Sequence, residues 1–391
     1  MKKYDFDTPV DRRHENSLKW DVKENELPMW VADMDFPAAP EIAAAVRRRA
    51  EKGVFGYTVV PENWYSAYAD WWSRRHGWKV EKEALCFCTG VVPAVTSAVK
   101  RLTEIGDKVV LQTPVYDIFF HSVENTGRIV SESPLVYGGG EYRVDFEDLE
   151  EKLADPRASL MILCNPHNPV GKIWSIEELA KIGELCEKYG VIVLSDEIHC
   201  DLVLPGKRYT PFASVSGTCA KNSVICLAAS KAFNLAGLQS AAVAVTEENL
   251  RCKIVRGLNA DEVAEPNCFA AESAAAAFTY GEAWLCELNA YLAENKKFAV
   301  DFINKHTSAR AVLSEATYLI WIDCGAFVND SEDFAAFLRR ETGLILSAGA
   351  QYRGNGKRFV RLNAACPKSV LADGLERFAR GAAAYAAKRG G

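Results

Sequence analysis

Lys231 lies just after an apolar run that has the composition of a buried strand. The run is Val224–Ala229, and Ser230 separates it from the lysine. A lysine at the end of a buried strand loses part of its hydration, and this loss lowers its pKa. A neutral amine can form a Schiff base with a carbonyl compound, which is the chemistry of enzymes that use pyridoxal 5′-phosphate (PLP). The alternative is a strand-end lysine whose ammonium group reaches solvent.

A second candidate group follows another apolar run. Val191–Ser195 has the composition of a buried strand, and after it come Asp196, Glu197, Ile198 and His199. A carboxylate at such a position is costly unless a cation pairs with it, and a pyridinium nitrogen is a suitable cation. The alternatives are a helix cap or an internal salt bridge for Asp196, and a hydrogen-bonded core histidine for His199.

Three further turns follow apolar runs. Asn168 lies between two prolines in Asn165–Gly171, and its amide can donate to a phenolate oxygen. Tyr116 can stack on a flat ring, or it can pack in the core. Thr89–Ala94 leads into a predicted helix, whose first backbone N–H groups can hold a phosphate. Each turn also has an ordinary structural interpretation. The proposed chemistry therefore requires that the three turns lie close together in the fold.

The elements that must position these residues alternate between short apolar strands and helices. Ser175–Glu178 has the capping-box pattern that opens a helix. Near-continuous apolar runs suit strands buried on both faces, and their alternation with helices predicts a doubly wound α/β sheet with ligands at the carboxyl ends of its strands. We expect strands at Leu85–Cys88, Lys108–Gln112, Leu160–Cys164, Val191–Ser195, Val224–Ala228 and Ala241–Val245.

The remaining segments predict a second, smaller α+β unit. Residues 1–50 form an N-terminal arm and part of this unit, residues 51–285 form the large domain, and residues 286–391 form the small C-terminal domain. Within the last third we expect strands at Thr317–Ile322 and Phe359–Leu362 and helices at Glu282–His306, Glu332–Thr342 and Lys368–Lys388.

Composition narrows the class of protein. The chain has 391 residues, with 46 Lys and Arg against 52 Asp and Glu, so its net charge of -6 offers little to a nucleic acid. The 12 cysteines are scattered, which predicts reduced thiols and no clustered metal ligands. The N-terminus turns acidic before any apolar signal region, and no apolar stretch approaches 18 residues. We therefore expect a cytoplasmic protein with no metal, nucleic-acid or membrane partner.

Together these motifs resemble a known family. The chain is similar to fold-type I PLP-dependent enzymes of the class I/II aminotransferase superfamily, and within it to the cystathionine β-lyase branch, the MalY/PatB-like C–S lyases. The resemblance implies an aspartate aminotransferase-like fold with a mainly parallel seven-stranded sheet, and a homodimer with a shared active site. Eight segments carry it almost end to end: Lys19–Asp21, Leu27–Phe36, Val54–Thr58, Gly90–Ala94, Asn165–Gly171, Ser195–His199, Ser230–Gln239 and Phe359–Pro367.

The resemblance implies roles around the cofactor ring. Lys231 would form the Schiff base with PLP, and Asp196 would pair with the pyridine nitrogen. Asn168 would bond the O3′ oxygen, with His199 near the same edge. Tyr116 would stack on the ring.

It also implies contacts to the phosphate. The backbone amides of Val91 and Val92 would bind it, and Tyr57 would reach it from a second subunit. Ala228 stands where many relatives have a hydroxyl, which leaves Ser230 as an alternative donor.

For the substrate, the resemblance implies that Arg361 clamps the α-carboxylate as a bidentate fork. Ala32 lies in the arm that would close over the substrate. Tyr318 is a candidate for the side-chain pocket, as is Arg353, which replaces a frequent glycine.

The implied reaction is α,β-elimination from L-cystathionine or a related cysteine S-conjugate, giving a thiol, pyruvate and ammonia. Lys231 would remove the Cα proton while Asp196 keeps the pyridine nitrogen protonated. Tyr57 and Tyr116 are both candidates for protonating the leaving sulfur, and the sequence does not select between them.

Two other functions share the same lysine. An aminotransferase would need a 2-oxo acid acceptor, and the segments Trp30–Phe36 and Asn165–Gly171 favour elimination over it. A PLP-binding regulatory protein with little catalysis is the second alternative. Regulators on this fold usually carry an N-terminal helix-turn-helix domain, and the opening residues are too few and too aromatic for one.

Overall fold

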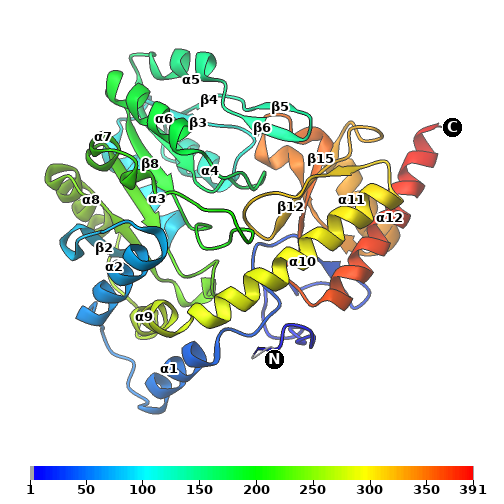
Figure 1. Cartoon of the computed structure of the whole chain (residues 1–391), viewed down its shortest axis with the longest axis horizontal. Helices are drawn as coiled ribbons and strands as arrows, with labels where there is room; N and C mark the ends of the chain where they lie inside the picture. The colour runs from blue at the N-terminus through cyan, green and yellow to red at the C-terminus, as the bar shows by residue number, and fades with distance from the viewer. Residues whose placement is uncertain (1–3, 391) are drawn as a thin grey trace.

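A seven-stranded sheet forms the larger part of the molecule (Figure 1). The computed structural model describes residues 4–390, so Met1–Lys3 and Gly391, which the predicted domains include, lie outside the described residues. Only β10 runs antiparallel to its neighbours, which confirms the predicted mainly parallel α/β fold. In spatial order the strands are β2 (Leu85–Cys88), β10 (Ala241–Ala244), β9 (Ser223–Leu227), β8 (Ile192–Asp196), β7 (Ala158–Cys164), β3 (Lys108–Leu111) and β4 (Ile129–Glu132).

Six of these strands lie within two residues of the ranges expected from apolar runs. The seventh, β4, was not among those ranges. It is an edge strand whose Ile129 is exposed and whose other residues are half-buried, so it lacks the continuous apolar run that marks a strand buried on both faces.

Two layers of helices cover the sheet. The core on one face involves α3 (Val91–Leu102), α4 (Ile118–Glu124) and α8 (Glu248–Ala260). The core on the other face involves α2 (Glu62–His76), α5 (Phe146–Leu153), α6 (Ile176–Lys188), α7 (Gly217–Lys221) and α9 (Ala270–Tyr280). The predicted capping box is confirmed at α6, where the Ser175 hydroxyl and the Glu178 carboxylate each accept the other residue's backbone N–H.

A smaller antiparallel sheet lies beside the large one (Figure 1). Its order is β11 (Arg310–Ala311), β12 (Leu319–Asp323), β15 (Phe359–Asn363) and β14 (Ser347–Ala348). One face packs in a separate core with α10 (Glu282–His306), α11 (Ser331–Thr342) and α12 (Lys368–Gly390). The other face, which carries Trp321 and Phe359, belongs to the core of the large sheet. The ends of both sheets can therefore contribute to one site.

The N-terminal segment joins both parts. β1 (Leu27–Pro28) pairs with β13 (Leu344–Ile345) beside the small sheet, while α1 (Pro40–Glu51) packs on α9. A hairpin of β5 (Val136–Gly138) and β6 (Glu141–Arg143) reaches the small sheet, where Trp321 donates to the Tyr142 hydroxyl at 3.0 Å. Across residues 4–390, no helix combines the length and the apolar character needed to cross a bilayer.

Candidate active site

The predicted site residues that follow strands of the large sheet lie at one edge of it. In the register of β7, β8 and β9, Cys164 lies opposite Asp196, which lies opposite Cys226. The turn after β7, the residues after Asp196 and the segment leading to Lys231 therefore start side by side. This is the carboxyl edge of the parallel strands, where ligands bind in open α/β sheets.

Lys231 lies at the centre of this cluster. Its Nζ donates to the backbone oxygen of Ala32 at 2.7 Å. Burial lowers the pKa of Lys231 to about 8, and Arg361 acts in the same direction, whereas Asp33 and Asp196 oppose it. A pKa near 8 leaves part of the amine neutral at physiological pH, so Lys231 can act as a nucleophile or a base.

Asp196 is the carboxylate of the cluster. It is buried, and its Oδ1 accepts the N–H of Ile198 at 3.1 Å. Burial raises the pKa of Asp196 to about 6, against the effects of the Ile198 N–H and of Lys231. An incompletely compensated buried carboxylate of this kind favours a cationic or proton-donating partner.

His199 and Asn168 line the same region. Burial lowers the pKa of His199 to about 3, with Lys231 and Arg361 adding to the effect, so its imidazole is neutral. Its Nδ1 has no partner among the residues that the structure describes. The Oδ1 of Asn168 accepts a hydrogen bond from Arg361 at 3.1 Å, which fixes the orientation of the amide.

Arg361 comes from the small sheet and completes the cluster. It is buried on β15, and its Nη2 donates to the Trp30 backbone oxygen at 3.0 Å. Its guanidinium lies 5.0 Å from the centre of the Tyr352 ring. The Nε is buried and has no partner within the described part of the chain. A buried guanidinium held by carbonyl groups suits an anionic ligand such as a carboxylate.

The segment 31–36 covers Lys231. The Ala32 oxygen that accepts from Lys231 also accepts from the Tyr318 hydroxyl, at 2.9 Å. Asn234 bonds the backbone of Met34 and Phe36, and Asn363 bonds the oxygens of residues 31 and 33. The structure thus places Tyr318 and Ala32 in contact with the lysine cluster.

The other predicted residues lie at its margin or away from it. Tyr116 is half-buried, and its pKa is raised by burial first and then by Asp117. Val91 and Val92 begin α3, whose N-terminus has no side-chain cap, and Ser230 is half-buried beside Lys231. The Tyr57 side chain is fully exposed.

Arg353, the other side-chain-pocket candidate, turns toward α4. Its guanidinium pairs with Glu124 at 2.6 Å and lies 4.0 Å from the Phe120 ring centre. These contacts occupy Arg353 outside the cluster around Lys231.

These residues fit a phosphorylated pyridine aldehyde. Such a molecule needs an amine for its carbonyl carbon, an acid beside its ring nitrogen, donors for its ring oxygen, and N–H groups for its phosphate. Lys231, Asp196 and Asn168 supply the first three, and the uncapped start of α3 supplies free backbone N–H groups. The unpartnered buried nitrogens of His199 and Arg361 also indicate that the cluster accommodates a ligand.

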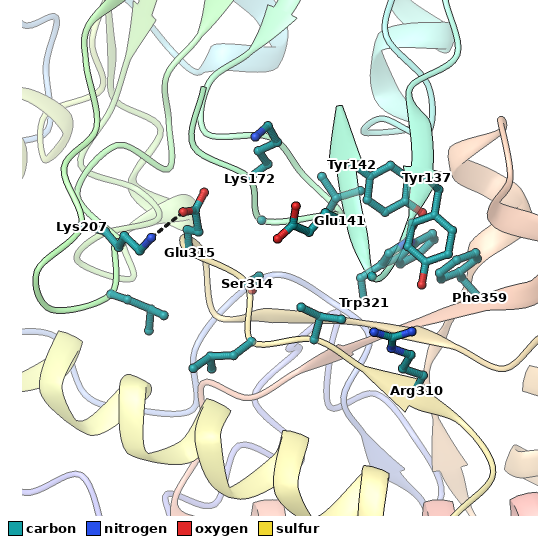
Figure 2. Close-up of a pocket in the computed structure, with 16 residues that line it drawn as sticks. Tyr137, Glu141, Tyr142, Lys172, Lys207, Arg310, Ser314, Glu315, Trp321 and Phe359 are labelled. Atoms are coloured by element: carbon teal, nitrogen blue, oxygen red, sulfur yellow. Dashed lines mark hydrogen bonds and ion pairs between the residues drawn. The ribbon is translucent and has the colours of Figure 1, made fainter. Parts of the chain in front are cut away.

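A separate cavity of about 480 Å³ lies between the β5–β6 hairpin and residues 310–315 (Figure 2). Four aromatic side chains gather at one side of it, and the ion pair of Lys207 with Glu315 lies at the other. Lys231, Asp196 and Arg361 are not among its lining residues. The cavity is therefore distinct from the candidate active site.

A cluster with metal-ligand chemistry lies elsewhere in the fold. The ligand atoms of His76, Cys200 and Asp201 are within 4.8 Å of one another. The Asp201 carboxylate contacts Arg75 at 2.7 Å, Trp71 at 3.0 Å and His76 at 3.0 Å. Ion-pair contacts from Arg75 and His76 thus engage one carboxylate oxygen and the Trp71 N–H engages the other, and the expectation that the protein has no metal stays a prediction.

Comparison with known proteins identifies the family. A family model described as Aminotransferase class I and II matches residues 27–378. The chain belongs to this family. The chain is similar to cystathionine beta-lyase PatB of Bacillus subtilis (strain 168), with 43% identity over 379 residues, which cover 95% of this chain and 98% of that protein.

Two solved structures extend the comparison. Cystalysin from Treponema denticola, which contains a PLP cofactor, has a TM-score of 0.94 and 31% identity, covering 97% of this chain and 98% of that chain. A PLP-bound protein of Clostridium difficile 630, named as an aminotransferase, has a TM-score of 0.94 and 37% identity, covering 97% and 99%. The aminotransferase-family fold therefore extends over almost the whole chain.

Sequence reasoning did not single out two asparagines that organise this aminotransferase-family site. Asn234 and Asn363 both bond the backbone of the segment over Lys231. Both lie inside segments that carried the resemblance, Ser230–Gln239 and Phe359–Pro367. Their partners are more than 190 residues away in sequence, so only the fold reveals this role.

Proposed function

We propose that this protein is a PLP-dependent carbon–sulfur β-lyase. It cleaves L-cystathionine or a related cysteine S-conjugate to a thiol, pyruvate and ammonia. The observation that carries the proposal is the 43% identity to the B. subtilis cystathionine beta-lyase over 95% of the chain. The lysine, carboxylate and guanidinium brought together at the sheet edge supply the chemistry that this reaction needs.

When bound, PLP supplies a carbonyl for an amine and a ring that accepts the electron pair left at Cα. Lys231 would hold its carbonyl carbon, Asp196 would hold its ring nitrogen, and Asn168 and His199 would contact the ring oxygen side. Tyr116 would stack on the ring. The N–H groups of Val91 and Val92, with Ser230 as a further donor, would hold the phosphate at the start of α3.

The substrate is oriented by its α-carboxylate. The Nε of Arg361 has no partner within residues 4–390, its planar fork matches a carboxylate, and its position is fixed by Asn168 and Trp30. Lys231, whose pKa burial lowers to about 8, takes the proton from Cα. The segment that carries Ala32, with Tyr318 against it, shields this proton transfer from water.

A phenol protonates the leaving sulfur. Tyr116, whose pKa burial raises, is protonated at neutral pH and is one candidate donor. Tyr57 is the other candidate, and within one chain its side chain points into solvent. A second copy of the chain would be needed to use it.

The assembly that we propose is a homodimer. Four exposed apolar side chains lie close together in sequence between α1 and α2, at Val54, Phe55, Tyr57 and Val59. Such a cluster is typical of a surface that binds another protein. A second copy covering it would carry Tyr57 to the neighbouring phosphate site. We place this dimer in the cytoplasm, where its cysteines stay reduced.

The test uses purified, PLP-loaded protein and L-cystathionine without any 2-oxo acid. The proposal expects pyruvate and homocysteine to accumulate over many turnovers. Stoichiometric conversion of PLP to its pyridoxamine form, with turnover only after a 2-oxo acid is added, would establish an aminotransferase instead.

A further inference from the structure

Lys296 is a buried lysine that the proposed chemistry does not use. It lies within α10 and is 1% exposed. Its Nζ donates to the backbone oxygens of Ser314 at 2.7 Å, Ala316 at 3.1 Å and Thr317 at 3.0 Å. All three ammonium hydrogens therefore have carbonyl acceptors, which offsets the cost of burying the charge.

The residues that Lys296 binds form a tight connection, which we call the carbonyl loop (residues 314–317). Thr317 has a positive φ of 64°, a conformation that is uncommon for a β-branched residue. The N–H of Ala316 donates to Gly171 at 2.9 Å, and that of Thr317 donates to Leu202 at 2.7 Å. Three carbonyls directed at one point repel each other, so the ammonium stabilises this loop shape.

The carbonyl loop joins two parts of the candidate active site. Tyr318 follows it directly, and its hydroxyl shares the Ala32 oxygen with Lys231. The loop also contacts Gly171, whose oxygen accepts from the Ala316 N–H. Gly171 ends the turn that holds Asn168 beside Arg361. A Cβ on Gly171 would come within 2.7 Å of the Ala316 oxygen, so the loop and the turn are in close contact.

The outer side of the loop faces the cavity in Figure 2, where Ser314 and Glu315 line the wall. Glu315 pairs with Lys207 at 2.7 Å. The loop is therefore held by an exposed ion pair outside and by the Lys296 ammonium inside.

We propose that Lys296 is a positioning residue for the lyase reaction, acting through the carbonyl loop on Tyr318 and on the segment that covers Lys231. The inference rests on the proposed function. It predicts that Lys296 affects turnover although it touches neither the cofactor nor the substrate.

The charge of Lys296 gives a signature that a purely packing role would not have. Burial lowers the pKa of Lys296 to about 7, while Glu315 acts to raise it. The other charges near Glu315 are Lys207 and Lys172. A neutral amine has two N–H groups, so above this pKa one of the three carbonyls loses its donor.

Linkage fixes the sign of the effect on stability. An unfolded lysine titrates near about 10.4, so between about pH 7 and 10.4 the unfolded state binds more protons than the folded state. The Lys296 contribution to the free energy of unfolding therefore rises with pH over this window. A variant without the amine lacks this contribution.

The experiment compares Lys296→Met with Lys297→Met, because Lys297 is the next residue on α10, is exposed, and pairs with Asp301 on the surface. At pH 6.5 we expect Lys296→Met to lose about tenfold in kcat/KM for L-cystathionine, since three carbonyls lose the hydrogen bond from Lys296. The deficit shrinks toward pH 9. Lys297→Met stays within about twofold of wild type at both pH values.

A double-mutant cycle with Tyr318→Phe tests the route. If Lys296 acts through Tyr318, the combined loss is smaller than the product of the single losses. Fully multiplicative losses, or a Lys296→Met variant that behaves like Lys297→Met, would overturn the proposal. If Lys296→Met does not fold, Lys296→Arg keeps the charge and is expected to restore folding while its activity no longer changes near pH 7.

Melting temperatures provide a readout that needs no catalysis. The difference between wild type and Lys296→Met is expected to grow in favour of wild type from pH 7 to pH 9.5. A constant difference would contradict the lowered pKa of Lys296, and with it the predicted pH dependence, even in an active enzyme. If the melting-temperature difference grew with pH but wild type had no lyase activity, the proposed function would be wrong while the assignment of Lys296 as a buried amine would hold.

Discussion

The proposed chemistry gives Lys231 two roles, which are to hold PLP and to move the Cα proton. Lys231→Ala is expected to lower pyruvate formation by at least about 100-fold, because the general base is lost. After borohydride reduction, mass spectrometry should find PLP attached to wild type and absent from the variant. Lys297→Ala, which removes an exposed lysine, is the matched control. Sustained turnover by Lys231→Ala would contradict the assignment.

Arg361 offers a test of substrate orientation at the same scale. Lysine in its place keeps the charge but loses the planar fork that matches a carboxylate. Arg361→Lys is therefore expected to raise KM for L-cystathionine by about 10- to 100-fold, with a smaller change in kcat. Steady-state kinetics at fixed PLP saturation measures both. An unchanged KM would place the α-carboxylate elsewhere.

At the scale of elements, the sequence predicts the strands that are buried on both faces of the sheet. The apolar runs located β2, β3, β7, β8, β9 and β10, and with them the carboxyl edge where Asp196 and Lys231 lie. The same signal is absent from the edge strand β4 and from the two-residue strands β11 and β14. Such strands owe their conformation to a neighbour rather than to their own composition.

Asn234 connects the segment after β9 to the segment over Lys231. Its φ is 58°, and its amide makes three hydrogen bonds of 3.0 Å to the backbone of Met34 and Phe36. Asn234→Ala removes these bonds and strains the backbone, so we expect unfolding free energy to fall by about 2–4 kcal/mol. Urea denaturation of the variant and of the exposed control Asn249→Ala measures this. Equal stability of the two variants would show that the bonds contribute little.

At the scale of the whole molecule, the site draws on parts of the chain that no local pattern connects. Arg12 and Lys19 bond Asp33 and Asp35, and these contacts fix the covering segment from the N-terminal side. The sequence does not show which charged residues pair, because the same residue types form both exposed and buried ion pairs. Lys19 and Asp35 are both buried here, so this pairing depends on the folded arm.

The proposed dimer places Tyr57 of one copy at the active site of the other, so each site needs residues from both chains. Lys231→Ala has no amine, and Tyr57→Phe lacks the hydroxyl, so each variant alone is impaired. In a mixed dimer, the chain that keeps Lys231 meets a partner that keeps Tyr57, and one of the two sites is intact. Random exchange of equal amounts should therefore restore about a quarter of wild-type activity. Light scattering on the same fractions reports the dimer. Activity equal to the mean of the two separate variants would show that each site is built from one chain.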